Sequence, residues 1–239
     1  MVSFSEVFSV KKPIIGMIHL AGHTASEKLD RAIEELRIYN EEGADGAIIE
    51  DYHGEPEDVV NALKESKRGF SIQRGVNLLR DPYRAFALAF AYGASFIQFD
   101  SVQTLDLEQK IYRRCRQTCD NIAVLGGVGF KYTRPTGRPL EVDLAEGKSR
   151  CEAIVTTGTG TGIETPLDKL RQYKKVLGDF PLIVGAGVNA NNIQAQLAVA
   201  DGAIIGSYFK LGGNTHFPVE RSRVRSLMDI VRQIRDSKS

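Results

Sequence analysis

The stretch Ile14-Ile-Gly-Met-Ile-His-Leu20 is apolar along nearly its whole length, and similar stretches recur along the chain. An apolar run without alternation is typical of a parallel strand that is covered on both faces. Each run is followed by a glycine-rich or polar break and then by an amphipathic helical segment. The further predicted strands are residues 46–50, 70–76, 95–99, 122–128, 153–156, 182–184 and 203–205.

The predicted strands recur every 27 residues or so, roughly the length of one strand–helix unit. Eight such units predict an α/β fold with a single (β/α)8 TIM barrel over residues 1–239, because these barrels usually have about 250 residues. A doubly wound open sheet is the alternative. We favour the barrel because the count reaches eight and the spacing never widens. The weakest unit is the fifth, where residues 132–147 have few helix signals.

Several segments between the runs have signals of a helix start or of a helix face. Asp81-Pro82 and Thr165-Pro166 are each typical of an N-cap followed by proline at the first helical position. Residues 219–234 have one apolar face. We predict that the opposite face is exposed to solvent on the outside of the barrel, and the alternative is a surface that binds a membrane or a partner. That opposite face contains Arg221, Arg225, Arg232 and Arg235.

The composition is that of a globular protein, with 42% hydrophobic and 26% charged residues. Its 31 basic and 30 acidic residues argue against a nucleic-acid-binding protein, which usually has a basic excess. No apolar run approaches the roughly 20 residues that cross a bilayer, so we expect no membrane insertion. The first ten residues lack the pattern of a signal peptide, and three cysteines do not form a disulfide framework. We therefore expect a cytoplasmic protein with reduced thiols.

Glycine-rich segments follow the last three predicted strands. The chain reads TTGTGTG over residues 156–162, GAGVN over 185–189 and GSYFK over 206–210. Loops after strands seven and eight of a TIM barrel often bind phosphate through backbone amides. The alternative is that these glycines only turn a tight corner. We expect phosphate or a similar anion to be bound by Thr157, Gly158, Gly185, Gly187, Gly206 and Ser207.

Two better-known nucleotide-binding motifs are not matched. Val142 stands where a P-loop ending in Gly147-Lys148-Ser149 requires glycine. Ile163 stands where a dinucleotide fingerprint starting at Gly158 requires glycine or alanine. The sequence therefore supports neither an ATPase nor a nicotinamide enzyme, and we expect no cofactor. A flavin-phosphate binder is a less favoured alternative.

Two acidic residues stand at predicted strand ends, where TIM barrels place their active sites. Glu50 ends the second strand and Asp100 follows the fourth. A carboxyl group in a partly dry barrel mouth can have a raised pKa that suits general acid or base catalysis. Facing each other, the two could polarise a sugar hydroxyl or activate water. Alternatively, one of them pairs with Arg74 or Lys131 and only balances the charge of the mouth.

Other polar residues follow the same strands. Lys131 could neutralise a substrate anion, and the alternatives are a Schiff base with a carbonyl substrate or a surface position. Side chains that could donate hydrogen bonds to a substrate are His19, Arg74, Asn77 and Gln98.

Histidines and cysteines raise the question of a metal site. His19 and His53 follow the first two strands and could form an open zinc site with Glu50. The HxH and HExxH spacings of common metal sites are missing, so we predict hydrogen-bonding histidines and no metal. Cys115 and Cys119 lie one helical turn apart without an obvious third ligand.

Several motifs resemble those of the BtpA/SgcQ family. Lys12-Pro-Ile-Ile-Gly-Met-Ile-His-Leu20 is similar to the opening signature of that family. The resemblance extends from the first strand to the last helix, and it implies a TIM barrel. One branch of the family is associated with photosystem I biogenesis, and another is described as a nucleosidase of sugar operons. Further similar stretches are residues 75–80, 153–158, 185–188 and 201–206.

The sequence departs from the family pattern at the barrel mouth. The fourth strand, which usually ends in Arg and Asn, here has Gln98 and Asp100. Gly127 stands where the family usually has Asp before a Val-x-Lys-His stretch, and Tyr132 stands in place of the His. The resemblance thus implies a retained Lys131 without its usual acid and histidine.

Together these patterns predict an enzyme that acts on a phosphorylated sugar or a nucleoside-like substrate. Glu50, Asp100 and Lys131 are its predicted catalytic residues. The main alternative is a non-catalytic assembly or regulatory factor, as in the photosystem branch of the family. The expected partner is a phosphorylated small molecule, and association into a homo-oligomer stays open because TIM barrels commonly associate.

Overall fold

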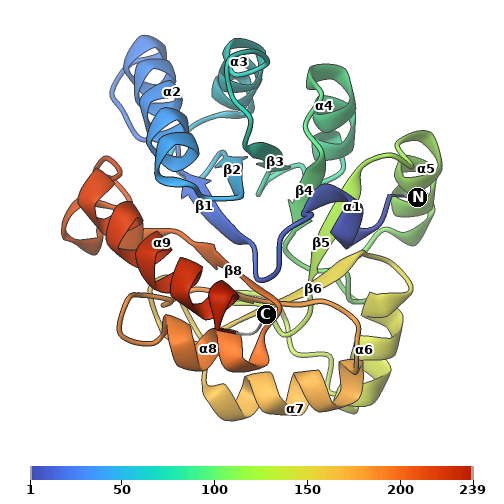
Figure 1. The fold of residues 1–239 in the computed structure, drawn as a ribbon. Helices are drawn as coiled ribbons and strands as arrows, with labels where there is room; N and C mark the ends of the chain where they lie inside the picture. Colours follow the sequence, from blue (N-terminus) through green and yellow to red (C-terminus); the bar gives the residue numbers. More distant parts are fainter. Residues whose placement is uncertain (1, 238–239) are drawn as a thin grey trace.

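The computed structural model describes residues 2–237 and contains eight parallel strands that close into a barrel in sequence order (Figure 1). The ring closes between the first and last strands, where Gly16 pairs with Ile205. The prediction of a TIM barrel is therefore confirmed. The strands are β1 (Ile14–Ile18), β2 (Gly46–Glu50), β3 (Gln73–Asn77), β4 (Phe96–Phe99), β5 (Ala123–Gly127), β6 (Ala153–Thr157), β7 (Leu182–Gly185) and β8 (Gly202–Ile205).

Helices alternate with the strands and surround the barrel (Figure 1). The fifth unit, which has few helix signals in its sequence, nevertheless contains α6 at Leu140–Lys148. The other helices are α1 (Phe4–Val7), α2 (Ala25–Glu42), α3 (Pro56–Glu65), α4 (Arg84–Tyr92), α5 (Gln109–Thr118), α7 (Leu167–Leu177), α8 (Ile193–Val199) and α9 (Arg221–Asp236), with short 3-10 turns at η1 (Ser207–Phe209) and η2 (Leu211–Gly213).

Both predicted helix caps are wrong. Tyr83 rather than Asp81 is the N-cap of α4, although the Asp81 carboxylate accepts the backbone N–H of Arg84 at 3.3 Å. The prediction for Thr165 is wrong, because its hydroxyl donates to the carbonyl oxygen of Gly185 at 2.8 Å and Pro166 is the N-cap. Thr165 is buried and ties the start of α7 to the end of β7.

Alternate residues of each strand belong to two separate cores. Ile14 and Ile49, for example, face the helices and pack in the layer between strands and helices. Ile15 and Ile48 belong to a second cluster, which fills the barrel interior. Successive side chains of a strand point to opposite faces of the sheet. The last inward-facing side chain of each strand therefore points into the mouth of the barrel.

The amino-terminal segment closes one end of the barrel interior. Phe4, Val7 and Phe8, on and next to α1, pack in the interior cluster, and the Phe8 ring lies 5.3 Å from the ring of Phe96. In Figure 1, α1 lies across this end close to β4 and β5. The opposite end, at which the strands finish, therefore holds the loops that can bind a ligand.

The arginine face of α9 lies on the outside of the barrel and also forms ion pairs. Arg221 and Arg225 form ion pairs with Glu42 of α2, at 2.9 and 2.8 Å. Arg235 pairs with Asp45 and has a side chain only 19% exposed. The predicted solvent-exposed face is confirmed for Arg225 and Arg232, whose side chains are 59% and 49% exposed, and the ion pairs also join α9 to the α2 side of the barrel. Among the described helices, none combines the length and the apolar character needed to cross a membrane.

Candidate functional site

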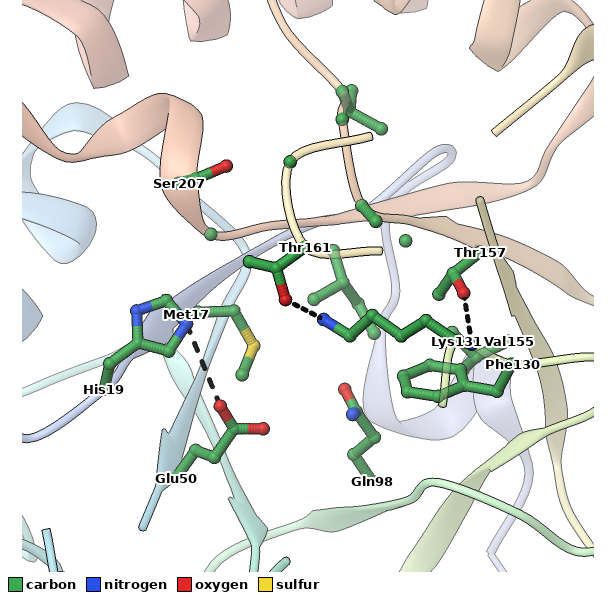
Figure 2. A pocket seen from close by; sticks show the side chains of 17 residues that line it. Met17, His19, Glu50, Gln98, Phe130, Lys131, Val155, Thr157, Thr161 and Ser207 are labelled. Carbon is green, nitrogen blue, oxygen red and sulfur yellow. Dashed lines mark hydrogen bonds and ion pairs between the residues drawn. The ribbon is translucent and has the colours of Figure 1, made fainter. Parts of the chain in front are cut away.

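The inward-facing series of several strands end in polar side chains or in glycine at the barrel mouth. Strand register places Glu50 beside Asn77 and Thr157 beside Gly185. These ends surround a pocket with about 520 Å³ of space, part of it open to solvent (Figure 2). The pocket is lined by Met17, His19, Glu50, Gln98, Phe130, Lys131, Val155, Thr157, Thr161, Gly162, Gly185, Ala186, Gly187, Val188, Ile204, Gly206 and Ser207.

The predicted pair of carboxylates is linked by an amide. Asn77 donates one hydrogen bond from Nδ2 to Glu50 Oε1 at 2.7 Å and another to Asp100 Oδ1 at 3.1 Å. Gln98 also donates to Asp100 Oδ1, at 2.8 Å. The structure thus brings the two acids together, but Asp100 and Asn77 line a neighbouring pocket rather than the one that contains Glu50.

Burial dominates the protonation of these acids. It raises the pKa of Glu50 to about 8, and the charge of Asp100 adds to this effect. Burial also raises the pKa of Asp100, while the amide hydrogen bonds from Gln98 and Asn77 oppose it. Because Asn77 occupies Oε1, the proton of Glu50 is expected on Oε2, whose neighbour is His19 Nε2 at 3.8 Å. Glu50 is therefore a carboxyl group that is still protonated at neutral pH.

The two strand-end histidines have different surroundings. His19 is buried in the pocket wall, and this burial, more than the charge of Lys210, lowers its pKa well below the usual range. His53 forms a hydrogen bond with Thr215 at 2.9 Å and stacks on His216 with ring centroids 3.8 Å apart. Within residues 2–237, no group of three or more His, Cys, Asp or Glu side chains is arranged to hold a metal ion.

Lys131 extends across the pocket (Figure 2). Its backbone N–H donates to Thr157 Oγ1 at 2.6 Å, and its Nζ donates to Thr161 Oγ1 at 3.3 Å. In the described part of the chain its ammonium has no ion pair within 4.0 Å, so neither candidate acid neutralises it. Lys131 therefore offers a positive charge to a ligand in the mouth.

The other side of the mouth is built from backbone. Ala186 and Gly187 both have positive φ values, of 61° and 66°, and a side chain on Gly187 would collide with the backbone of Glu164. Ser207 begins the short helical turn η1 after β8. Among the described residues, the backbone N–H groups of Gly187, Val188 and Ser207 have no hydrogen-bond acceptor. Free amides on two adjacent loops are the groups that bind a phosphate in such a barrel.

Thr161 lines the pocket although it is not among the predicted site residues. Its hydroxyl lies 3.4 Å from the hydroxyl groups of both Tyr52 and Tyr132, and its backbone N–H donates to Tyr132 at 3.1 Å. The loop after β6 is thereby fixed over the mouth. In the sequence, the alternating Thr-Gly segment indicates a functional loop at this position. It does not indicate which residue of that loop lines the pocket.

A buried ion pair supports the loop after β8. Lys210 Nζ donates to Glu35 Oε2 at 2.6 Å, and both side chains are almost completely buried. The other carboxylate oxygen of Glu35 accepts the backbone N–H of Val219 at 3.1 Å. Glu35 of α2 thus fixes both ends of the segment 210–219, which immediately follows Ser207 and η1.

Two predicted placements need correction, and a third predicted residue, Thr157, lines the mouth pocket with its hydroxyl already engaged. Arg74 does not reach the mouth, because it faces the helices and its guanidinium donates to the carbonyl oxygens of Tyr92 and Gly93 at the end of α4. Gly158 lines an adjacent groove rather than the mouth pocket, and the Thr157 hydroxyl is engaged by its bonds to Lys131 and Gly158.

Gly127, the last residue of β5, has a steric reason to be glycine. A Cβ atom on Gly127 would lie 1.9 Å from the carbonyl oxygen of Asp100. The backbone after β4 therefore occupies the space that a side chain at position 127 would need.

Comparisons with known proteins identify relatives over nearly the whole chain. The sequence profile of the BtpA family matches residues 10–233. An uncharacterised protein of Archaeoglobus fulgidus is 32% identical, over 92% of this chain and 98% of its own. The photosystem I biogenesis protein BtpA of Synechocystis is 26% identical, over 94% of this chain and 89% of its own.

Solved structures share the fold at low sequence identity. N-(5′-phosphoribosyl)anthranilate isomerase from Pyrococcus furiosus has a TM-score of 0.62 and 15% identity, over 93% of this chain and 99% of its own. A mutant tryptophan synthase α-subunit from Pyrococcus furiosus has a TM-score of 0.65 and 17% identity, over 91% and 98% respectively. Similarities at this level support the TIM barrel and nothing more specific.

Proposed function

Because the chain belongs to the BtpA family of TIM barrels, we propose that its open barrel end is an active site for a phosphorylated sugar or nucleoside-like substrate. One observation carries this proposal: a single pocket combines a buried, protonated carboxyl group, Glu50, with free backbone amides on the loops after β7 and β8. Neither feature alone requires catalysis. A proton donor and an anion site that share one pocket are what such a reaction needs.

The phosphate would bind to the amides of Gly187, Val188 and Ser207. Backbone N–H groups suit this task because they donate hydrogen bonds without introducing a titratable side chain. Lys131 lies across the same pocket and adds the positive charge that a dianion requires. The phosphate would thereby fix one end of the substrate and place its sugar against Glu50.

Glu50 would act as the general acid. With a pKa of about 8 it keeps its proton at neutral pH, and Asn77 leaves Oε2 as the oxygen that can donate. In a nucleosidase reaction, water adds to the anomeric carbon while the bond to the leaving group breaks. The leaving group takes the bonding electron pair and receives the proton of Glu50, and the proton that the added water loses returns to the Glu50 carboxylate. Asp100 remains coupled to Glu50 through Asn77 and stabilises the positive charge that develops on the sugar.

Thermal unfolding in the presence of ligands tests the proposal. We expect ribose 5-phosphate to raise the melting temperature, because a ligand at 100 times its Kd stabilises the fold by about 2.7 kcal/mol. Ribose without phosphate and inorganic phosphate alone are the controls and should have smaller effects. If no phosphorylated sugar or nucleotide stabilises the protein, the anion site is wrong.

The family also supports a second candidate, a non-catalytic assembly factor, because its Synechocystis relative is named a photosystem I biogenesis protein. The Glu50→Gln variant separates the two. An enzyme would lose turnover but still bind ribose 5-phosphate, whereas an assembly factor would keep its cellular activity in this variant.

A further inference from the structure

A second pocket lies beside the mouth pocket, on the rim above β3 and β4. Its space of about 650 Å³, part of it open to solvent, is lined by both apolar and polar side chains. Leu79 and Pro82 form part of its apolar wall, and its polar residues include Asn77, Asp100, Tyr132 and Arg134. Asn77 connects the two pockets, because its side-chain amide contacts Glu50 in one and Asp100 in the other.

Asp100 offers this second pocket an unused acceptor. Its Oδ1 accepts hydrogen bonds from both Asn77 and Gln98, at 3.1 and 2.8 Å. Among residues 2–237, no side chain or backbone group donates to its Oδ2. The two amides hold the carboxylate in one orientation, so the free oxygen is a fixed acceptor for an N–H donor of a ligand.

Tyr132 offers the same pocket an aromatic surface. The side chain is 75% exposed although its hydroxyl is held by the backbone N–H of Thr161 at 3.1 Å. An aromatic ring that is fixed at its hydroxyl and otherwise open can stack against a flat ligand group. Leu79, which is 40% exposed, contributes a further apolar surface to this pocket.

The position of this pocket relative to the phosphate loops determines the shape of the ligand. In a closed barrel of eight strands in sequence order, β3 and β4 lie opposite β7 and β8. A molecule held by the amides of Gly187 and Ser207 at one end would pass Glu50 and Lys131 before it reached Asp100. Its three parts are therefore an anion, a central reacting group and a distal flat group with an N–H donor.

We propose that the pocket between Asp100 and Tyr132 is a subsite for a planar nitrogen-containing ring, so that the substrate is a ribosyl phosphate bearing such a ring, as in a nucleoside 5′-monophosphate. This inference rests on the proposed function, because the phosphate loops and Glu50 define the other two parts of the substrate. The ring stacks on Tyr132 and donates an N–H to Asp100 Oδ2.

Calorimetric titration with a set of fragments tests this subsite. The ligands are ribose 5-phosphate, the 5′-monophosphates of adenosine, cytidine, guanosine and uridine, and the corresponding nucleosides. We expect at least one nucleotide to bind ten or more times tighter than ribose 5-phosphate. Asp100→Asn and Tyr132→Ala should each reduce that preference to less than threefold.

Two matched variants separate the subsite from general damage. Tyr132→Phe keeps the ring and should retain most of the preference, whereas Tyr132→Ala removes it. Asp168→Asn makes the same chemical change as Asp100→Asn on the exposed surface of α7, where the side chain is 84% exposed, and should have no effect. Circular dichroism melting curves establish that each variant is folded.

The outcomes distinguish this inference from the proposed function. If ribose 5-phosphate binds but no nucleotide binds more tightly, the ring subsite is wrong while the phosphate site stands. If a nucleotide preference survives both Asp100→Asn and Tyr132→Ala, the ring lies elsewhere and the inference is overturned. If neither ribose 5-phosphate nor any nucleotide binds, the proposed function and the subsite both fail.

Discussion

The two halves of the barrel mouth are built from different chemical groups. On the side of β7 and β8, the pocket is lined by Gly187, Val188 and Ser207, whose backbone N–H groups have no acceptor among the described residues. On the side of β2 and β4, the mouth presents the side chains of Glu50, Asp100 and their amide partners. One half thus offers fixed donors without titratable side chains, and the other offers groups whose protonation depends on burial.

This difference indicates a division of labour. Backbone amides keep the same donor character at every pH of interest, which suits recognition of an anion. A buried carboxyl group can hold a proton at neutral pH, which suits proton transfer. If this is correct, changes on the β8 side should affect ligand affinity, and changes on the β2 side should affect the dependence of stability and turnover on pH.

The largest expected effect follows from placing a negative charge among the amides. Ser207→Asp should weaken binding of ribose 5-phosphate by about 100-fold or more, because the new carboxylate repels the phosphate at close range. Isothermal titration calorimetry measures this change. Ser222→Asp, on the exposed side of α9, is the matched control and should bind the ligand normally. Equal affinities for the two variants would place the anion elsewhere.

Replacing the buried acid should change stability in a direction that depends on pH. The folded protein keeps the proton of Glu50 up to a pKa of about 8, whereas the unfolded chain releases it near pH 4.5. The free energy of unfolding therefore falls as pH rises between these two values. Glu50→Gln removes this loss, which amounts to about 1.4 kcal/mol for each pH unit by which the pKa is raised, so the variant should gain stability on the order of a few kcal/mol relative to the parent protein as pH rises to 8.

Urea unfolding at several pH values between 5 and 8.5 measures the prediction for Glu50. The advantage of Glu50→Gln should grow steadily as pH rises. Glu57→Gln is a suitable control, since the Glu57 side chain is 73% exposed and its substitution should leave the pH profile unchanged. Parallel pH profiles for the parent protein and Glu50→Gln would mean that Glu50 is ionised at neutral pH.

Much of this arrangement follows from the sequence by simple rules. The eight apolar runs predict the barrel, and the strand period of two predicts that Ile48 and Glu50 share the inner face. The same rule excludes Arg74 from the mouth. It lies three residues before the inward-facing Asn77, so its side chain must face the helices. The prediction for Arg74 is wrong because it rests on nearness to a strand end alone, which ignores the alternation of side chains along a strand.

Other features depend on contacts that strand patterns do not encode. The two hydrogen bonds from Asn77 to Glu50 and Asp100 require particular side-chain rotamers on three neighbouring strands or loops. The helix α1 has only four residues, too few for a periodic signal, although it closes the barrel interior. The ion pair between Lys210 and Glu35 joins residues 175 positions apart. These contacts had to come from the structure.

The structure gives Arg74 a role in stability, which can be tested separately from ligand binding in the mouth. Its guanidinium donates to the carbonyl oxygen of Gly93 at 2.9 Å and to that of Leu63 at 3.4 Å. Arg74→Met should lower the free energy of unfolding by about 1.5 kcal/mol, because carbonyl groups at the ends of two helices lose a charged donor. Affinity for ribose 5-phosphate should stay within twofold.

The control for Arg74 is an arginine on the mouth side of the same unit. Arg80 is 69% exposed and pairs with Glu55, so Arg80→Met should cost no more than about 0.5 kcal/mol. Urea unfolding measures both variants. A loss of ligand affinity in Arg74→Met would mean that Arg74 contributes to the binding site after all.

The smallest expected effect concerns the histidine pair at the edge of the mouth. Burial, together with the charges of His216 and Lys210, lowers the pKa of His53 to about 4, whereas in the unfolded chain it lies near 6.5. The unfolded state therefore binds a proton first as pH falls, and the folded protein loses stability between pH 6.5 and 4. This direction is opposite to that expected for Glu50, which favours the folded state on acidification.

Because His53 is only half-buried, we expect His53→Gln to reduce the acid-induced loss by about 1 kcal/mol or less. The variant keeps a hydrogen-bonding group for Thr215, and urea unfolding at pH 7 and pH 5 measures the difference. His23→Gln, at an exposed position, should leave the loss unchanged. An identical loss in the His53 and His23 variants would assign the acid sensitivity to other groups.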